Sequence, residues 1–301
     1  MGKNILGNVA KTNDGIEIYY EVTGTGEPII FVHEYAGDFR SWEQQVRHFS
    51  RQFKCITYNA RGYTPSTVPE EVEKYSQEFA RDDLLAVLDD LEIKTSHIVG
   101  LSMGAFATLH FGMTYPERVN SMVIAGCGYG AEPQTRELFI EEAENTAKQI
   151  NQETMESFAK GYVKSPNRIQ YFNKDQRGAI EFEKQLGEHS TVGSANTILG
   201  VQSRRPSLYD LETEIRKLKI PTLIINGDED EPCLNVGIFL KKLITTSAMI
   251  TLPQTGHASN LEEPSLFNMF CDNFFHKVDT GQWKERDPHS FKGGIMSRPG
   301  K

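Results

Sequence analysis

The chain has 301 residues, of which 38% are hydrophobic and 24% are charged, and its formal net charge is −9. This length allows a large buried core, and an acidic chain without a block of Lys or Arg is not expected to bind nucleic acid. Residues 1–14 are polar and no run of 18 apolar residues occurs, so we predict a soluble cytoplasmic protein without a signal sequence, a membrane anchor or a membrane partner.

Strands and helices alternate along the first 130 residues. The apolar positions change period from two to between three and four as the chain proceeds, which predicts parallel strands joined by helical crossovers. We therefore expect an α/β fold with a doubly wound, mostly parallel sheet. In chain order the predicted elements are an edge strand at 16–22, a buried strand at 29–33, a helix at 40–49, a strand at 55–59, a helix at 77–91, a strand at 97–99, a helix from 103 to about 115, and a strand at 121–125.

The sequence Gly100-Leu101-Ser102-Met103-Gly104 lies between the strand at 97–99 and the helix that follows it. A strand that turns sharply into a helix at the serine would present its hydroxyl as a nucleophile, and the flanking glycines allow the two backbones to approach each other. Ser102 is therefore the candidate nucleophile. The backbone N–H of Met103, the next residue, is a candidate donor to an oxyanion.

Two further candidates follow strands in the second half of the chain. The apolar segment 221–226 leads into a loop that carries Asp228 and Asp230, and either carboxylate could orient a histidine. The strand predicted at 248–252 leads to His257, the candidate general base. The chain order is thus Ser, Asp, His, with each residue just past the end of a strand.

Residues 131–218 are acidic and rich in helix-forming residues, which predicts a helical cap inserted after the sixth strand. The core would then comprise residues 1–130 and 219–276. Aromatic residues of the insert either form the core of the cap or line a substrate pocket, and the pocket candidates are Phe139, Phe158 and Tyr162. Residues 277–301 show little apolar periodicity and are predicted to form a tail that is either disordered or packed on a partner subunit, as in a homodimer.

The chain from about residue 9 to residue 276 resembles the α/β-hydrolase superfamily. The resemblance rests on the serine motif, on a strand that ends in Phe31-Val32-His33, on the loop at 57–66, and on the segment from Gly256 to Pro264. The esterase and enol-lactonase branches are the most similar. The resemblance implies that Asp230 is the triad acid, that Asp228 supports the loop, and that the cap closes over the site.

The chain departs from this family immediately after His33. The family usually has glycine at the next position, and the residue after that glycine donates a backbone N–H to the oxyanion. Here the positions hold Glu34 and Tyr35, so Tyr35 inherits the donor role by position. Glu34 either faces solvent or lies in the pocket, where its carboxylate would repel anionic substrates.

These features predict a serine hydrolase that cleaves a small-molecule carboxylic ester or lactone, with no cofactor and no metal. Cys55, Cys127, Cys233 and Cys271 have no paired spacing and are expected to be thiols.

One alternative function is hydrolysis of carbon-carbon bonds in ring-fission products, although those relatives usually have Gly-Pro-Gly where this chain has residues 34–37. Perhydrolysis as a side reaction is compatible with the triad. The other alternative is a ligand-binding receptor on a hydrolase scaffold.

Overall fold

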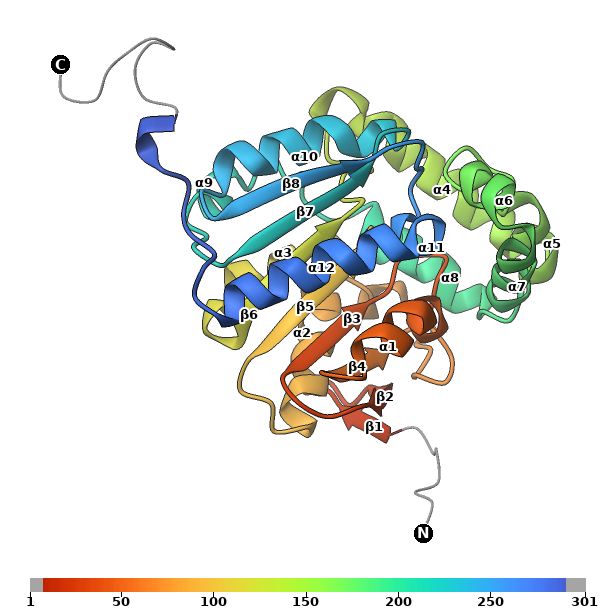
Figure 1. Cartoon of the computed structure of the whole chain (residues 1–301). Helices are drawn as coiled ribbons and strands as arrows, with labels where there is room; N and C mark the ends of the chain where they lie inside the picture. The colour runs from red at the N-terminus through yellow and green to blue at the C-terminus, as the bar shows by residue number, and fades with distance from the viewer. Residues whose placement is uncertain (1–7, 291–301) are drawn as a thin grey trace.

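The computed structural model describes residues 8–290. They contain eight strands that form one sheet, together with the helices that cover it (Figure 1). The strand order is β1-β2-β4-β3-β5-β6-β7-β8. The β1–β2 and β2–β4 pairs are antiparallel, and the remaining neighbours are parallel. The strands are β1 (Asn8–Lys11), β2 (Glu17–Thr23), β3 (Pro28–Val32), β4 (Lys54–Tyr58), β5 (Ser96–Leu101), β6 (Val119–Ala125), β7 (Thr222–Gly227) and β8 (Ser247–Leu252).

Helices cover both faces of this sheet. The α-helices are α1 (Glu43–Phe49), α2 (Gln77–Asp90), α3 (Met103–Thr114), α4 (Arg136–Gln152), α5 (Met155–Tyr162), α6 (Ile169–Lys174), α7 (Gln176–Gly187), α8 (Thr191–Thr197), α9 (Glu212–Ile215), α10 (Glu231–Leu243), α11 (Ser259–Glu262) and α12 (Pro264–Asp279). Short turns of other helix types are η1 (Phe39–Trp42), η2 (Val72–Lys74), η3 (Pro116–Arg118), η4 (Pro133–Thr135), η5 (Ile198–Gln202) and η6 (Pro288–Ser290).

The core divides between the two faces because side chains alternate along each strand. In β3, Ile30 and Val32 belong to the cluster that includes residues of α2, α3 and α10. Ile29 and Phe31 of the same strand belong to the cluster on the opposite face, with residues of α1 and α12. The predicted α/β architecture with a doubly wound, mostly parallel sheet is confirmed.

One strand assignment is wrong in its position. The alternation at 16–22 predicts an edge strand, but β2 lies between β1 and β4. Residues 8–11 pair with β2 in antiparallel register and form the edge in its place. Four residues are too short a segment to show a clear period, so the sequence pattern gave no sign of this strand.

The inserted helices form a separate layer beyond the carboxyl ends of the parallel strands, where α4 to α8 gather in Figure 1. Their own apolar cluster includes Ala143, Phe158 and Phe182, and it also includes Tyr35 and Met103 from the sheet side. The helical insert therefore packs directly on the loop that follows β3 and on the first residue of α3. The carboxyl ends of strands are where ligands bind in open α/β sheets.

Three smaller expectations concern the ends of the chain and its cysteines. Helix α12 continues to Asp279 and a 3-10 turn occupies 288–290, so part of the predicted tail has regular structure, while residues 291–301 lie outside the described residues. All four cysteines are buried free thiols. Over residues 8–290, none of the helices is long and apolar enough to cross a bilayer.

Candidate active site

Ser102 occupies a strained turn between β5 and α3. Its backbone angles are φ 54° and ψ −116°, a region that residues other than glycine rarely adopt and that is often retained at functional sites. The turn is held because the Ser102 N–H donates to the carbonyl of Ala125 at 2.8 Å. A Cβ at Gly104 would overlap the backbone of Val32, and one at Gly100 would overlap Gly104 itself. Both glycines are therefore required by the crowding of strand against helix.

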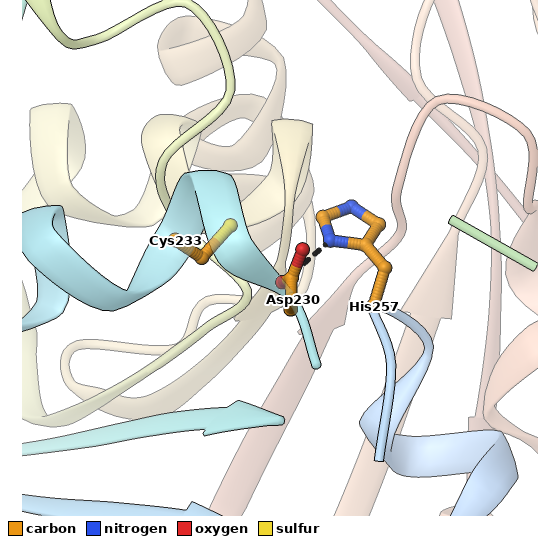
Figure 2. Close-up of side chains that lie close together, drawn as sticks. All are labelled: Asp230, Cys233 and His257. Carbon is orange, nitrogen blue, oxygen red and sulfur yellow. Dashed lines mark hydrogen bonds and ion pairs between the residues drawn. The ribbon is translucent and has the colours of Figure 1, made fainter. Parts of the chain in front are cut away.

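His257 and Asp230 point toward each other from two separate loops (Figure 2). The distance from His257 Nδ1 to Asp230 Oδ2 is 2.8 Å, and both side chains are buried. Burial would raise the pKa of Asp230, but the imidazole and its hydrogen bond outweigh this and hold the pKa below 3.8. Asp230 is thus an ionised acceptor that selects the His257 tautomer with a free Nε2. Asp228, the other carboxylate considered, accepts a backbone hydrogen bond from Thr255 at 3.0 Å.

Ser102 and His257 line the same cavity. Within residues 8–290, no hydrogen bond joins the Ser102 hydroxyl to the imidazole. Catalytic hydrogen bonds of this kind are often loose without substrate and tighten in the complex. The structure thus brings the Ser102 hydroxyl and the His257 imidazole to one cavity and joins the imidazole to the Asp230 carboxylate.

A buried carboxylate holds the loop that carries His257. Glu262, at the end of α11, accepts hydrogen bonds from the N–H groups of Gly256 at 2.7 Å and Ala258 at 3.1 Å. These residues are the immediate neighbours of His257, so one side chain fixes the backbone on both sides of the imidazole. Burial raises the pKa of Glu262, and the two N–H donors oppose that effect.

The two predicted oxyanion donors follow two different strands, β5 and β3. Met103 is the first residue of α3, so its N–H has no acceptor within the helix. Tyr35 follows β3, and its side chain lines the same cavity as Ser102. The Tyr35 hydroxyl donates to the carbonyl of Ser194 at 3.1 Å, which joins this loop to α8 of the insert.

Glu34 is buried, so the solvent-facing alternative is wrong. Its carboxylate forms an ion pair with Arg168, which immediately precedes α6 and is fully buried as well. Burial would raise the pKa of Glu34, but the guanidinium outweighs this and keeps the pKa below 4.5. The repulsion of anions expected from a lone carboxylate is therefore largely cancelled by the cation beside it.

The cavity at Ser102 has a volume of about 140 Å³ and lies between the sheet and the insert. Of the predicted pocket residues, Glu34, Phe139 and Tyr162 line it. Phe158 is not among the described residues that line the cavity, and its ring packs against Tyr162 with centroids 5.4 Å apart in the apolar core of the insert. Tyr129 also lines the cavity, with its ring 4.8 Å from that of His257.

Cys233 lies beside Asp230 and His257 (Figure 2). Ligand atoms of Asp230, Cys233 and His257 lie within 4.8 Å of one another. Two of these groups are already joined by the hydrogen bond between Asp230 and His257, and burial raises the pKa of the Cys233 thiol well above 9.0. A metal ion would have to break that bond and bind the thiolate form, so the geometry favours a protonated thiol next to the Asp230 carboxylate.

Sequence reasoning missed three residues that shape this site. Glu262 follows His257 by five positions, within the segment from Gly256 to Pro264 that carries the family resemblance. Tyr129 lies four residues after β6, at the same edge of the sheet as the other site loops, and this placement was the available signal. The sequence held no signal that would identify Arg168, because this residue lies 134 positions from Glu34 in the chain.

Comparisons with known proteins agree with this fold. A family model described as "alpha/beta hydrolase fold" matches residues 27–264. The chain is 26% identical over 266 residues to 3-oxoadipate enol-lactonase 2 of Acinetobacter baylyi, covering 85% of this chain and 92% of that protein. The bromoperoxidase from Bacillus anthracis superposes with a TM-score of 0.76 at 27% identity, covering 90% of this chain and 99% of the other. A thermophilic esterase from Thermogutta terrifontis superposes with a TM-score of 0.79 at 23% identity, covering 90% of this chain and 98% of the other.

Proposed function

Because the chain belongs to the alpha/beta hydrolase fold family, we propose that it is a serine hydrolase that cleaves a carboxylic ester or lactone through an acyl-enzyme. The observation that carries the proposal is that His257, which contacts Asp230 at 2.8 Å, lines the same cavity as Ser102 on its strained turn. The 26% identical relative is named an enol-lactonase, which supports an ester or lactone as the bond cleaved.

In the proposed reaction, Ser102 Oγ attacks the substrate carbonyl carbon while His257 Nε2 accepts the hydroxyl proton. Asp230 stabilises the imidazolium that results. The carbonyl electrons move onto the oxygen, which receives hydrogen bonds from the N–H groups of Tyr35 and Met103, each worth about 3 to 4 kcal/mol when preorganised. The leaving alkoxide then takes the proton from His257, and the acyl group remains on Ser102.

Water completes the cycle by the reverse sequence. His257 removes a proton from the water, the hydroxide adds to the acyl carbon, and the ester bond to Ser102 breaks as the hydroxyl regains its proton. The cap that we assign to residues 131–218 contributes Phe139 and Tyr162 to the cavity. A cavity of about 140 Å³ favours a short acyl group, so acetyl and butyryl esters should be better substrates than octanoyl esters.

The test is hydrolysis of a series of p-nitrophenyl esters, from acetate to octanoate, by the wild type and by Ser102→Ala. We expect turnover with a preference for short chains in the wild type, a burst of nitrophenol when deacylation is slow, and loss of both in the variant. Absence of turnover with every ester, combined with cleavage of a vinylogous diketone, would replace this proposal with carbon-carbon bond hydrolysis.

A further inference from the structure

The ion pair between Glu34 and Arg168 joins the turn after β3 to the helical insert. Arg168 Nη2 donates to Glu34 Oε1, and the two side chains are 0% and 3% exposed. Burying two charges costs free energy that their attraction offsets only with good geometry and further hydrogen bonds. Such a pair is therefore weak evidence for stability, and its role depends on the other groups that it contacts.

The second oxygen of Glu34 fixes the peptide that follows Tyr35. Glu34 Oε2 accepts a hydrogen bond from the Ala36 N–H at 3.0 Å. The carbonyl oxygen of the same peptide, that of Tyr35, accepts one from the Tyr63 hydroxyl at 2.7 Å. This peptide is thus held at both ends, and a planar group held at both ends cannot rotate freely.

The peptide that precedes Tyr35 is held through its carbonyl. The Glu34 carbonyl accepts hydrogen bonds from the Gly37 N–H at 3.2 Å and from His33 Nδ1 at 2.8 Å. His33 Nδ1 is the donor because its Nε2 accepts from the Ala60 N–H at 3.0 Å. In a trans peptide the N–H points away from the carbonyl, so these bonds also direct the Tyr35 N–H.

We propose that the Glu34–Arg168 ion pair is a positioning device that makes the oxyanion donor at Tyr35 depend on the docked insert. Arg168 holds the Glu34 carboxylate, the carboxylate holds the turn at 34–37, and the turn aims the Tyr35 N–H. The inference rests on the proposed function, because it assigns the pair a role in transition-state stabilisation. Glu34 and Arg168 are positioning residues, since they act through the Tyr35 N–H.

The test compares Glu34→Gln, Arg168→Met and the double variant with the wild type, using p-nitrophenyl butyrate and a boronic acid inhibitor. The tetrahedral boronate on Ser102 places an oxygen in the oxyanion hole, whereas KM reports mainly the ground state. We expect each single variant to lose about tenfold or more in kcat with KM within about twofold, and the inhibition constant of the boronic acid to rise in parallel. Lys174→Met is the matched control, because Lys174 of α6 forms another ion pair across the same boundary, with Glu263.

The double variant separates positioning from stability. It removes both buried charges, so its melting temperature should exceed that of Arg168→Met, while its kcat should stay low. Recovery of wild-type kcat together with melting temperature would show a purely structural pair and overturn the inference. Single variants that fold and keep kcat within about twofold of Lys174→Met would overturn it as well. An active wild type with unaffected variants refutes the inference alone, whereas a wild type that cleaves no ester refutes the proposed function and the inference together.

Discussion

Replacing Glu262 with Gln should both destabilise the protein and slow the reaction. The carboxylate accepts from the two N–H groups that flank His257, and an amide has only one accepting oxygen, so its NH₂ group would face the remaining N–H. One buried donor then loses its partner, which costs about 1 to 3 kcal/mol. For a chain of this size the melting temperature should fall by about 2 to 6 °C.

The effect on catalysis follows from the position of the imidazole. The loop at 256–258 would relax, and a displacement approaching 1 Å at a catalytic group can cost about a hundredfold in rate. We expect kcat of Glu262→Gln to fall by about tenfold or more, measured with p-nitrophenyl butyrate at a temperature where the variant is folded. The matched control is Glu263→Gln, which changes the adjacent, partly exposed carboxylate. Equal kcat and equal melting temperature for the two variants would refute the reasoning about Glu262.

Three further predictions concern the acid, its neighbour and a partly buried histidine. Asp230→Asn should lower kcat by about 10⁴-fold, because the amide favours the wrong imidazole tautomer, whereas Asp228→Asn should retain most activity. If ester kinetics show the larger loss of kcat in Asp228→Asn, Asp228 is the triad acid instead. Cys233→Ala should lower kcat by less than about tenfold and Cys233→Ser should restore it, because a hydroxyl beside the Asp230 carboxylate can donate a hydrogen bond to it. Equal rates for Ala and Ser would exclude a role for a donor at this position. Burial lowers the pKa of His110 to about 4, so the unfolded state binds the proton first and the stability of the fold falls as the pH drops from 6.5 towards 4. Between pH 7 and pH 4.5, denaturant titrations should show the wild type losing about 2 kcal/mol more of its free energy of unfolding than His110→Gln. An equal loss in the two proteins would contradict the assignment.

The sequence predicted the fold well where the apolar period was long and regular. The run at 97–99 falls within β5, and the run at 29–33 coincides with β3 up to Val32, because buried parallel strands are almost continuously apolar. The edge of the sheet was misassigned, since β1 has only four residues and its pairing with β2 depends on tertiary contact.

The candidate site was predictable in the parts that are local in sequence. Ser102 and Met103 lie in one motif, and His257 lies in a recognisable loop after β8. Contacts between distant segments were not accessible. The pairing of Glu34 with Arg168 depends on how the insert docks onto the sheet, and no period or spacing in the sequence encodes that docking. The same limit applied to Phe158, whose place in the core of the insert could not be distinguished from a place in the cavity wall.

The central claim is that Ser102 is a nucleophile activated by His257. The most direct measurement is the intact mass of the protein after treatment with a serine-directed phosphonate, followed by peptide mapping of the adduct. The account predicts one adduct on Ser102 in the wild type, none in Ser102→Ala, and much slower labelling in His257→Gln. Absence of an adduct in the folded wild type, or an adduct on another residue, would contradict it.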